Sequence, residues 1–268
     1  MKIEKKKEMN SNSSKPLVIS ALHLPSLYRG HSYSMPWLKD YVLSNVKVFV
    51  DGGIPAVMLQ DEAMNETDAK PETIAVMAAL GSAIRHEFPE LKLGIIIESH
   101  DGIAPLAVAY ACGASFVRIK VFVGAMLKSS GIQNGCGISA VNYRHQLKRE
   151  EIEIFADVHD RTGIPMQDVS IEKVSRWAIH TGADGLILTG FSFDQSLEYL
   201  NRVRQSCIPK PLFMGGSVTI ENVREVLNYA DGVIVSSSLM KDNPDPDDLV
   251  KWDIEKVSRF MDVCLSIN

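Results

Sequence analysis

The chain has 268 residues, of which 46% are hydrophobic and 23% are charged, a balance typical of a globular protein with a large core. The net charge of −5 excludes a strongly basic surface that could track phosphate backbones, so we expect no nucleic-acid partner. No run reaches the ~18 apolar residues of a membrane helix. The N-terminus lacks an apolar signal core, so we expect no transmembrane segment and a cytoplasmic location.

The first residues differ in composition from the rest. Residues 1–15 are rich in Lys, Glu, Ser and Asn, and such a segment cannot bury enough apolar surface to fold. We therefore expect a disordered N-terminal tail over residues 1–15 and one domain over residues 16–268.

Eight short apolar runs recur in that domain. Each is rich in Val, Ile, Leu or Phe and is too short for a buried helix. Amphipathic segments such as 72–87, 170–181 and 220–228 lie between them and are typical of helices. Strict alternation requires a parallel sheet, and eight units close a barrel. The sequence predicts an α/β fold, a single (β/α)8 TIM barrel, with strands at Leu17–Leu24, Ala56–Asp61, Leu93–Glu98, Phe116–Phe122, Ile152–Val158, Gly185–Gly190, Pro211–Gly216 and Gly232–Ser237.

A weak repeat supports these units. Gly53, Gly113 and Gly182 each stand just before a predicted strand. A glycine there can adopt positive φ and end the preceding helix. We expect the chain to turn at these residues directly from helix into strand.

Alternation within the strands assigns polar side chains to the barrel interior. The apolar positions of the fourth strand must face the helices, so Arg118 and Lys120 point inward. The same argument turns Asp157 and His159 inward in the fifth strand, while Glu98 ends the third. Arg118 could pair with Glu98 or Asp157 in a structural network. Alternatively, Lys120, Asp157, His159 and Glu98 form a catalytic cluster at the strand ends, where barrel enzymes place their chemistry. Lys120 would then act as a base or a Schiff-base nucleophile.

Asp61, which closes the second strand, and His23, near the end of the first, are further candidates. His23 fits a buried core histidine as well as a catalytic one. Asp61, Glu98, Asp157 and His159 carry donors suited to a divalent ion. Because the cluster lacks a second histidine, we predict no cofactor and no metal site, and a divalent metal stays an alternative.

The seventh and eighth units predict a phosphate site. The glycines in Gly215-Gly216-Ser217 let backbone N–H groups approach an anion, and Ser217 or Thr219 can cap the next helix. Ser236 and Ser237 follow the eighth strand, and the loops after strands seven and eight jointly hold a phosphate in many barrels. An ordinary Gly-Gly turn is the alternative. The glycine-rich segment 124–137 predicts a mobile cover over the strand ends, or a flexible connection.

These segments together resemble the BtpA/SgcQ family, over about residue 17 to the C-terminus. The resemblance implies a barrel of the ribulose-phosphate-binding type, with one branch associated with photosystem I assembly and another encoded among carbohydrate genes. Lys120 stands where members usually have asparagine. The residues that carry the resemblance are the segments 21–27, 116–121, 124–125, 131–132, 155–159, 183–185, 189–190, 216–219, 221–222 and 230–235.

Two functions follow from this sequence. The first is an enzyme, an isomerase or aldolase-type lyase, that acts on a small phosphorylated sugar or related metabolite. The second is a non-catalytic assembly or stability factor for a membrane protein complex. The sequence is compatible with a homo-oligomer.

Overall fold

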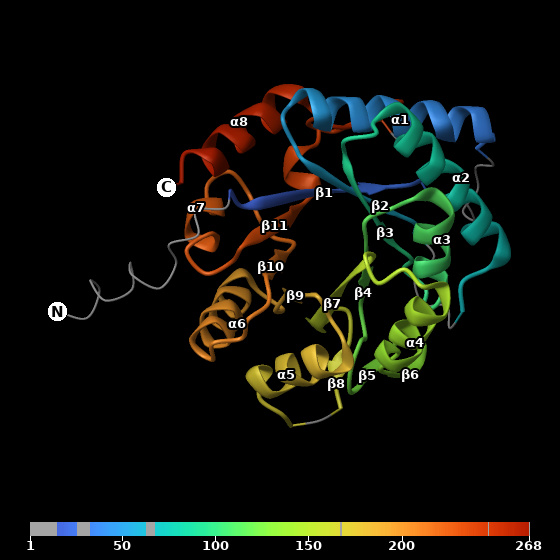
Figure 1. Ribbon diagram of the computed structural model, residues 1–268. Helices are drawn as coiled ribbons and strands as arrows, with labels where there is room; N and C mark the ends of the chain where they lie inside the picture. Colours follow the sequence, from blue (N-terminus) through green and yellow to red (C-terminus); the bar gives the residue numbers. More distant parts are fainter. Residues whose placement is uncertain (1–14, 26–32, 63–67, 167, 246, 268) are drawn as a thin grey trace.

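The computed structural model describes residues 15–25, 33–62, 68–166, 168–245 and 247–267. Residues 1–14 of the expected tail lie outside the described residues. Eight parallel strands form a closed barrel (Figure 1), which confirms the predicted fold. Around the barrel the order is β1-β11-β10-β9-β7-β4-β3-β2. The strands are β1 Leu17–His23, β2 Ala56–Gln60, β3 Lys92–Ile96, β4 Phe116–Ile119, β7 Glu153–His159, β9 Gly185–Leu188, β10 Leu212–Gly215 and β11 Gly232–Val235.

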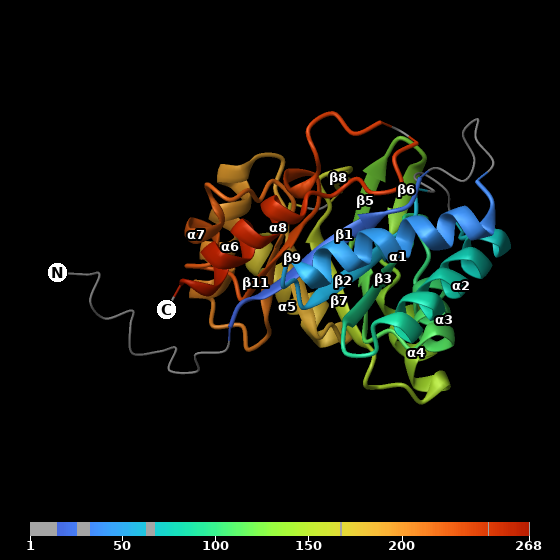
Figure 2. The same cartoon turned by 90° about the horizontal axis from the view of Figure 1, so that it is seen from above.

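Helices surround the barrel and run back along its outside (Figures 1 and 2). Buried residues of the outer strand faces pack against them in one large core. The helices of the described chain are α1 Met35–Asp51, α2 Pro71–Glu87, α3 Ala104–Cys112, α4 Gly137–Leu147, α5 Ile171–Thr181, α6 Phe193–Gln205, α7 Val223–Val226 and α8 Ile254–Leu265, with a short 3-10 turn, η2, at Ser237–Leu239.

A second, smaller core fills the lumen of the barrel. Phe155 stacks between Phe116 and Phe213. The centroid of the Phe155 ring lies 4.9 Å from the centroid of each of the other two rings. Gly94 makes room for this stack, since a Cβ there would lie 2.1 Å from the Phe116 ring. The apolar plug closes the lumen below the strand ends, so polar side chains above it, such as Arg118, must face the open end of the barrel.

The predicted helix-ending glycines adopt the expected backbone. Gly113 and Gly182 are the left-handed C-caps of α3 and α5, with φ of 71° and 114°. Gly53, after α1, has φ of 89°. These tight endings let each helix turn directly into the next strand.

The segment predicted as a glycine-rich cover forms a β-hairpin. Strands β5 (Ala125–Lys128) and β6 (Gly131–Asn134) pair antiparallel, and β8 (Ile164–Pro165) extends them into a three-stranded sheet. Lys128 contacts Asp160 in a buried ion pair. His100 Nε2 lies 2.7 Å from the carbonyl oxygen of Asn134. The hairpin is thus fastened to the loops after β7 and β3, and its glycines make turns within a regular sheet.

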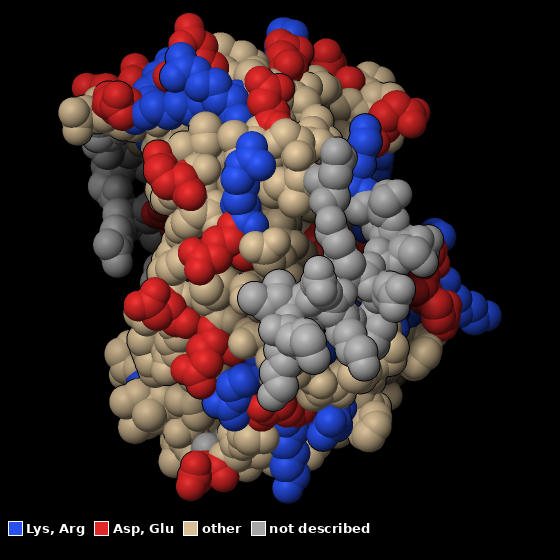
Figure 3. Space-filling model, turned by 90° about the vertical axis from the view of Figure 1, so that its left-hand side faces the viewer, with Lys and Arg blue, Asp and Glu red and all other residues tan. Residues whose placement is uncertain are grey.

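Among the described helices, none is long and apolar enough to cross a membrane. On the face shown in Figure 3, acidic and basic side chains are interspersed.

Candidate functional site

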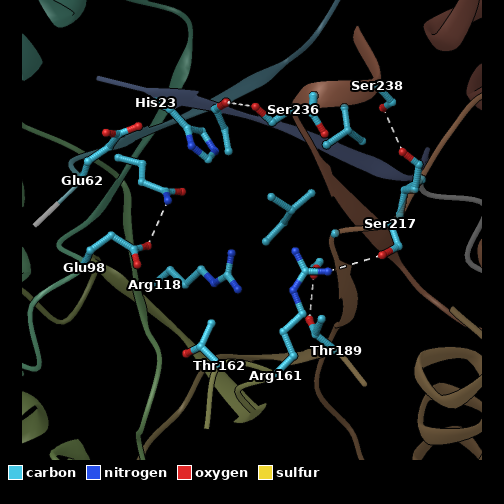
Figure 4. Close-up of a pocket in the computed structure, with 18 of the residues that line it drawn as sticks. His23, Glu62, Glu98, Arg118, Arg161, Thr162, Thr189, Ser217, Ser236 and Ser238 are labelled. Atoms are coloured by element: carbon cyan, nitrogen blue, oxygen red, sulfur yellow. Dashed lines mark hydrogen bonds between the residues drawn. The ribbon is translucent and has the colours of Figure 1, made fainter. Parts of the chain in front are cut away.

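A cavity of about 740 Å³ opens above the apolar plug, at the carboxyl ends of the barrel strands (Figure 4). It is within the size range of small-molecule sites. Ten of the predicted site residues line it: His23, Glu98, Lys120, Asp157, His159, Gly215, Gly216, Ser217, Ser236 and Ser237. The expected acid–base and phosphate ends therefore share one volume.

The eleventh predicted residue, Asp61, does not line this cavity. Its Oδ1 accepts a hydrogen bond of 2.6 Å from the backbone N–H of Glu98, so it links β2 to the end of β3. The inward residue of β2 is Gln60, because successive strand residues point to opposite faces. Gln60 Nε2 donates to Glu98 Oε1 at 2.9 Å, and it takes the place that we expected for Asp61.

Arg118 and Asp157 form a bidentate ion pair between neighbouring strands β4 and β7. Arg118 Nε and Nη2 donate to the two carboxylate oxygens at 3.1 and 3.0 Å. Burial raises the pKa of the Asp157 carboxyl to about 6, although Arg118 opposes the shift. A raised carboxyl pKa suits Asp157 to general acid–base chemistry. Figure 4 shows the Arg118 side chain pointing into the cavity.

Lys120 follows the last residue of β4 and pairs with Glu98 Oε2. The Glu98 carboxylate thus receives Lys120 on one oxygen and Gln60 on the other. His23 enters the same volume from β1 (Figure 4). Burial lowers the pKa of His23; Glu98 opposes this shift, and Arg118 and Lys120 reinforce it. His23 is therefore predominantly neutral above pH 6.5, a form with one ring nitrogen free to accept a proton.

A register shift between Asp157 and His159 pairs His159 with Leu188 of the outer core, whereas Asp157 pairs with Ile187 of the lumen. His159 Nδ1 lies 2.6 Å from the carbonyl oxygen of Thr189. Because a carbonyl oxygen only accepts, Nδ1 carries the proton, and Nε2 of the neutral ring is the accepting nitrogen. Phe191 and Tyr199 pack edge-on against the ring, with centroids 4.9 and 5.6 Å away, and hold its orientation.

Asp160, just past β7, is a further buried carboxylate of the cavity wall. Burial alone would raise the pKa of Asp160, but Lys120 and Lys128 outweigh it and lower the pKa to about 2. Asp160 also accepts hydrogen bonds from the backbone N–H and hydroxyl of Thr162, at 2.9 and 2.8 Å. Asp157 and Asp160 thus lie three residues apart with pKa values shifted in opposite directions, because Asp160 faces two lysines.

The loop after β10 has the backbone expected of an anion cradle. Gly216 and Ser217 both adopt positive φ, 102° and 59°. The Arg161 guanidinium lies over this turn, since a Cβ on Gly216 would approach it to 3.4 Å. Arg161 Nη1 donates to Ser217 Oγ at 3.3 Å (Figure 4). Consecutive residues of unusual φ, with a cation above them, form a concave site suited to phosphate.

Hydrogen bonds distinguish the hydroxyls around this loop. Ser236 Oγ donates to the carbonyl of Ala21 at 2.7 Å, and Ser238 Oγ donates to that of Val218 at 2.8 Å. Thr189 Oγ1 donates to the carbonyl of Gly215 at 2.8 Å. These three hydroxyl protons are therefore already donated to carbonyl oxygens of the protein. Ser217 Oγ accepts from Arg161, so its own proton can be donated to a ligand.

The predicted helix cap is wrong. The N-cap of α7 is Asn222 and not Ser217 or Thr219, and its side chain makes no cap hydrogen bond. Asn222 Oδ1 instead accepts from the backbone N–H of Thr219 at 2.8 Å, and its Nδ2 donates to the carbonyl of Ser217 at 2.9 Å. The asparagine shapes the loop from behind, and α7 is too short for a large helix dipole.

Within the described ranges, no group of three or more His, Cys, Asp or Glu side chains could hold a metal ion. Glu98 and Asp157, two donors of the metal alternative, are engaged by Lys120 and Arg118.

Four contributors were missed in the sequence: Gln60, Thr189, Asp160 and Arg161. Gln60 and Thr189 were detectable, because each lies two residues after an inward apolar residue, Met58 and Ile187. Arg161 carried no such signal. It lies in an irregular loop and meets Ser217, 56 positions away, only in the folded barrel.

Solved structures share the fold. The structure described as "Native KDPGal structure" aligns with a TM-score of 0.59 at 15% identity, covering 93% of this chain and 95% of that chain. N-(5'-phosphoribosyl)anthranilate isomerase from Pyrococcus furiosus aligns with a TM-score of 0.56 at 13% identity, covering 93% and 98%. Identities this low show a common fold alone.

Sequence relatives are more informative about family. The photosystem I biogenesis protein BtpA of Synechocystis sp. is 26% identical over 71% of this chain and 68% of its own length. The putative sgc region protein SgcQ of Escherichia coli is 24% identical over 91% and 92%. The model of the BtpA family matches residues 13–265, so this TIM-barrel chain belongs to the BtpA family.

Proposed function

We propose that the chain is an enzyme that acts on a small phosphorylated sugar or a related metabolite, by isomerisation or aldol-type cleavage. One observation carries the proposal. The 740 Å³ cavity joins an anion cradle at Ser217 and Arg161 to Asp157, a buried carboxyl whose pKa is about 6.

The cradle fits the phosphate group of such a substrate. The backbone of Gly215, Gly216 and Ser217 lines the cavity, Ser217 offers its hydroxyl proton, and Arg161 offers a guanidinium. Ser237 lies on the neighbouring loop, after β11. A phosphate fixed there would hold the sugar carbons over the ends of β4 and β7.

The other end supplies groups that move protons. Isomerisation and aldol cleavage both need a base beside a carbon or hydroxyl next to a carbonyl, and an acid that returns the proton. We assign the base to Asp157 and the proton donor to Lys120, with His159 Nε2 or His23 as the second acceptor. In a Schiff-base version, Lys120 attacks the substrate carbonyl, and Glu98 holds the lysine in position.

One of the solved structures that share the fold is, by its name, an isomerase of a phosphoribosyl compound. Its identity of 13% carries only the architecture, so the assignment rests on the residues of this cavity.

The test is turnover of candidate ketose and aldose phosphates, followed by ³¹P and ¹H NMR. We expect turnover by the wild type and a loss of about 100-fold or more in Asp157→Asn. Ser139→Ala on the exposed surface of α4 is the control and should keep full activity. Borohydride with a turned-over substrate tests the lysine: a mass adduct at Lys120 supports the Schiff base, and its absence removes that version while the acid–base assignment stands.

A second function, an assembly or stability factor for a membrane protein complex, is favoured by two observations. One relative is named a photosystem I biogenesis protein. The hairpin sheet also presents a row of paired, exposed apolar side chains, Ile132, Leu127 and Ile164, which are 59, 46 and 63% exposed. If Asp157→Asn retained the full cellular function while Leu127→Asp lost it, this second function would replace the first.

A further inference from the structure

A second cavity of about 410 Å³ adjoins the first one, at the side chains that we assign to chemistry. Lys120, Asp157 and His159 line both volumes. These three side chains therefore stand between a chamber that contains the phosphate cradle and a chamber that does not. A substrate held in the first chamber has its reacting atoms at the entrance to the second.

The second chamber lies outside the strand ends, between the hairpin and α5. Its apolar wall is formed by Val121 just after β4, Val158 of β7, Met126 of the hairpin and Val174 of α5. Tyr199 of α6 closes one side. A cavity of ~150 Å³ is enough to hold a benzene ring, so this chamber has room for an aromatic ring or a branched aliphatic group.

The charges around this chamber disfavour a second anion. Its arginine, Arg202, donates two hydrogen bonds to Glu172, at 2.8 and 3.1 Å, and one to Glu198, at 3.1 Å. Asp168 adds a negative charge to the lining. Arg161 in the first chamber has, among the described residues, no carboxylate within ion-pair distance. The two chambers thus differ in charge: one attracts a phosphate, and the other combines an apolar wall with paired charges and accepts an uncharged group.

We infer that the substrate has two parts, a phosphorylated sugar in the first chamber and an uncharged apolar or aromatic substituent in the second. The inference rests on the proposed function and narrows its substrate class. A simple triose or pentose phosphate would fill the first chamber only. The bond that joins the two parts would lie beside Lys120, Asp157 and His159.

Calorimetric titration with three probes tests this inference: inorganic phosphate, a pentose 5-phosphate, and the phenyl pentoside 5-phosphate. We expect the phenyl compound to bind about tenfold or more tightly than the pentose phosphate, which is the gain expected for burying an aromatic ring. If both phosphosugars bind equally well, the second chamber is not a substrate site, and the proposed function stands. If neither phosphosugar binds, the proposed function fails and this inference falls with it.

Two variants test whether the gain in affinity for the phenyl compound arises in the second chamber. Val169→Phe and Val123→Phe fill the second chamber from different walls, and each should abolish the preference for the phenyl compound while the affinity for the pentose phosphate stays within twofold. Val263→Phe is the matched control, a half-buried valine of α8 remote from both chambers, and it should keep the preference. Retention of the preference in both chamber-filling variants, with their folding verified by circular dichroism, would overturn the assignment.

Discussion

The two ends of the main cavity handle charge in different ways. At the ends of β3, β4 and β7, each cation faces a carboxylate, Arg118 with Asp157 and Lys120 with Glu98. At the ends of β10 and β11, the walls are backbone and hydroxyl groups, and the nearest cation, Arg161, contacts a serine. The first region is electrically balanced without a ligand, because burying unpaired charge is costly. The second is exposed to water and can keep an unbalanced positive charge until an anion arrives.

Breaking the Arg118–Asp157 ion pair should give the largest effect, a loss in the free energy of unfolding. Arg118→Met leaves the Asp157 carboxylate buried without its partner, so we expect a loss of about 3–5 kcal/mol in the free energy of unfolding at pH 8. The loss should be smaller at pH 5, where Asp157 can take up a proton. Urea denaturation at both pH values measures it. Lys47→Ala, which breaks a surface pair exposed by 66 and 50%, is the control and should cost less than about 1 kcal/mol.

The carboxyl groups of Asp157 and Asp160 should also make the free energy of unfolding depend on pH. The pKa of Asp157 is about 6 in the folded state against 3.8 for the free group, so between these values the folded state binds more protons. Stability should therefore fall as pH rises from about 4 to 6, by on the order of 1–3 kcal/mol. Asp160, with a pKa lowered to about 2, acts oppositely: its contribution is lost as pH falls from about 4 to 2. In Asp157→Asn the upper slope should vanish and the lower one persist; an unchanged upper slope would contradict the assignment.

At the ends of β10 and β11, loss of the Arg161 cation should weaken phosphate binding and leave the free energy of unfolding nearly unchanged. Arg161→Ala removes a charge-assisted contact that contributes ~1.5–3 kcal/mol, so we expect the affinity for a pentose 5-phosphate to fall by about tenfold or more. The free energy of unfolding should change by less than about 0.5 kcal/mol. Calorimetric titration and urea denaturation measure the two quantities. Arg149→Ala, an exposed arginine paired with Glu151 at 3.2 Å, should change neither.

The smallest expected effect is a difference between Ser236 and Ser217, two of the serines predicted to bind phosphate. Ser236→Ala removes a hydrogen bond to β1 and should cost about 1 kcal/mol of stability, with phosphate affinity within twofold of the wild type. Ser217→Ala should do the reverse, because its hydroxyl proton is available to a ligand. Equal losses of affinity in the two variants would show that the hydrogen bonds of the free protein do not decide which serine binds.

The fold was largely readable from the sequence, and the site in part. Eight apolar runs and the glycines at 53, 113 and 182 identify the units, because strand and helix patterning is local. Counting alternate residues placed Arg118, Lys120 and Asp157 in the lumen, but it could not detect the register shift that interrupts the alternation before His159. The same count of alternate residues, started from the inward residue Met58, would have predicted that Gln60, and not Asp61, is the next inward residue of the second strand. The hairpin pairing was not predicted, because Gly124, Gly131 and Gly135 look like loop residues, whereas the third strand, β8, and the contact with Asp160 lie about 30 positions further on.

By itself, the sequence determined the barrel, the inward polar residues of the fourth and fifth strands, and the glycine-serine loop after the seventh strand. Each of these depends on periodicity or on the conformational freedom of single residues. Only the tertiary structure decided which carboxylate each cation contacts, which serine hydroxyls are committed, that Arg161 lies over Ser217, and that a second chamber opens behind Asp157. Those features arise from contacts between residues far apart in the chain, and hydrogen-bond partners and burial exist only once the strands have closed.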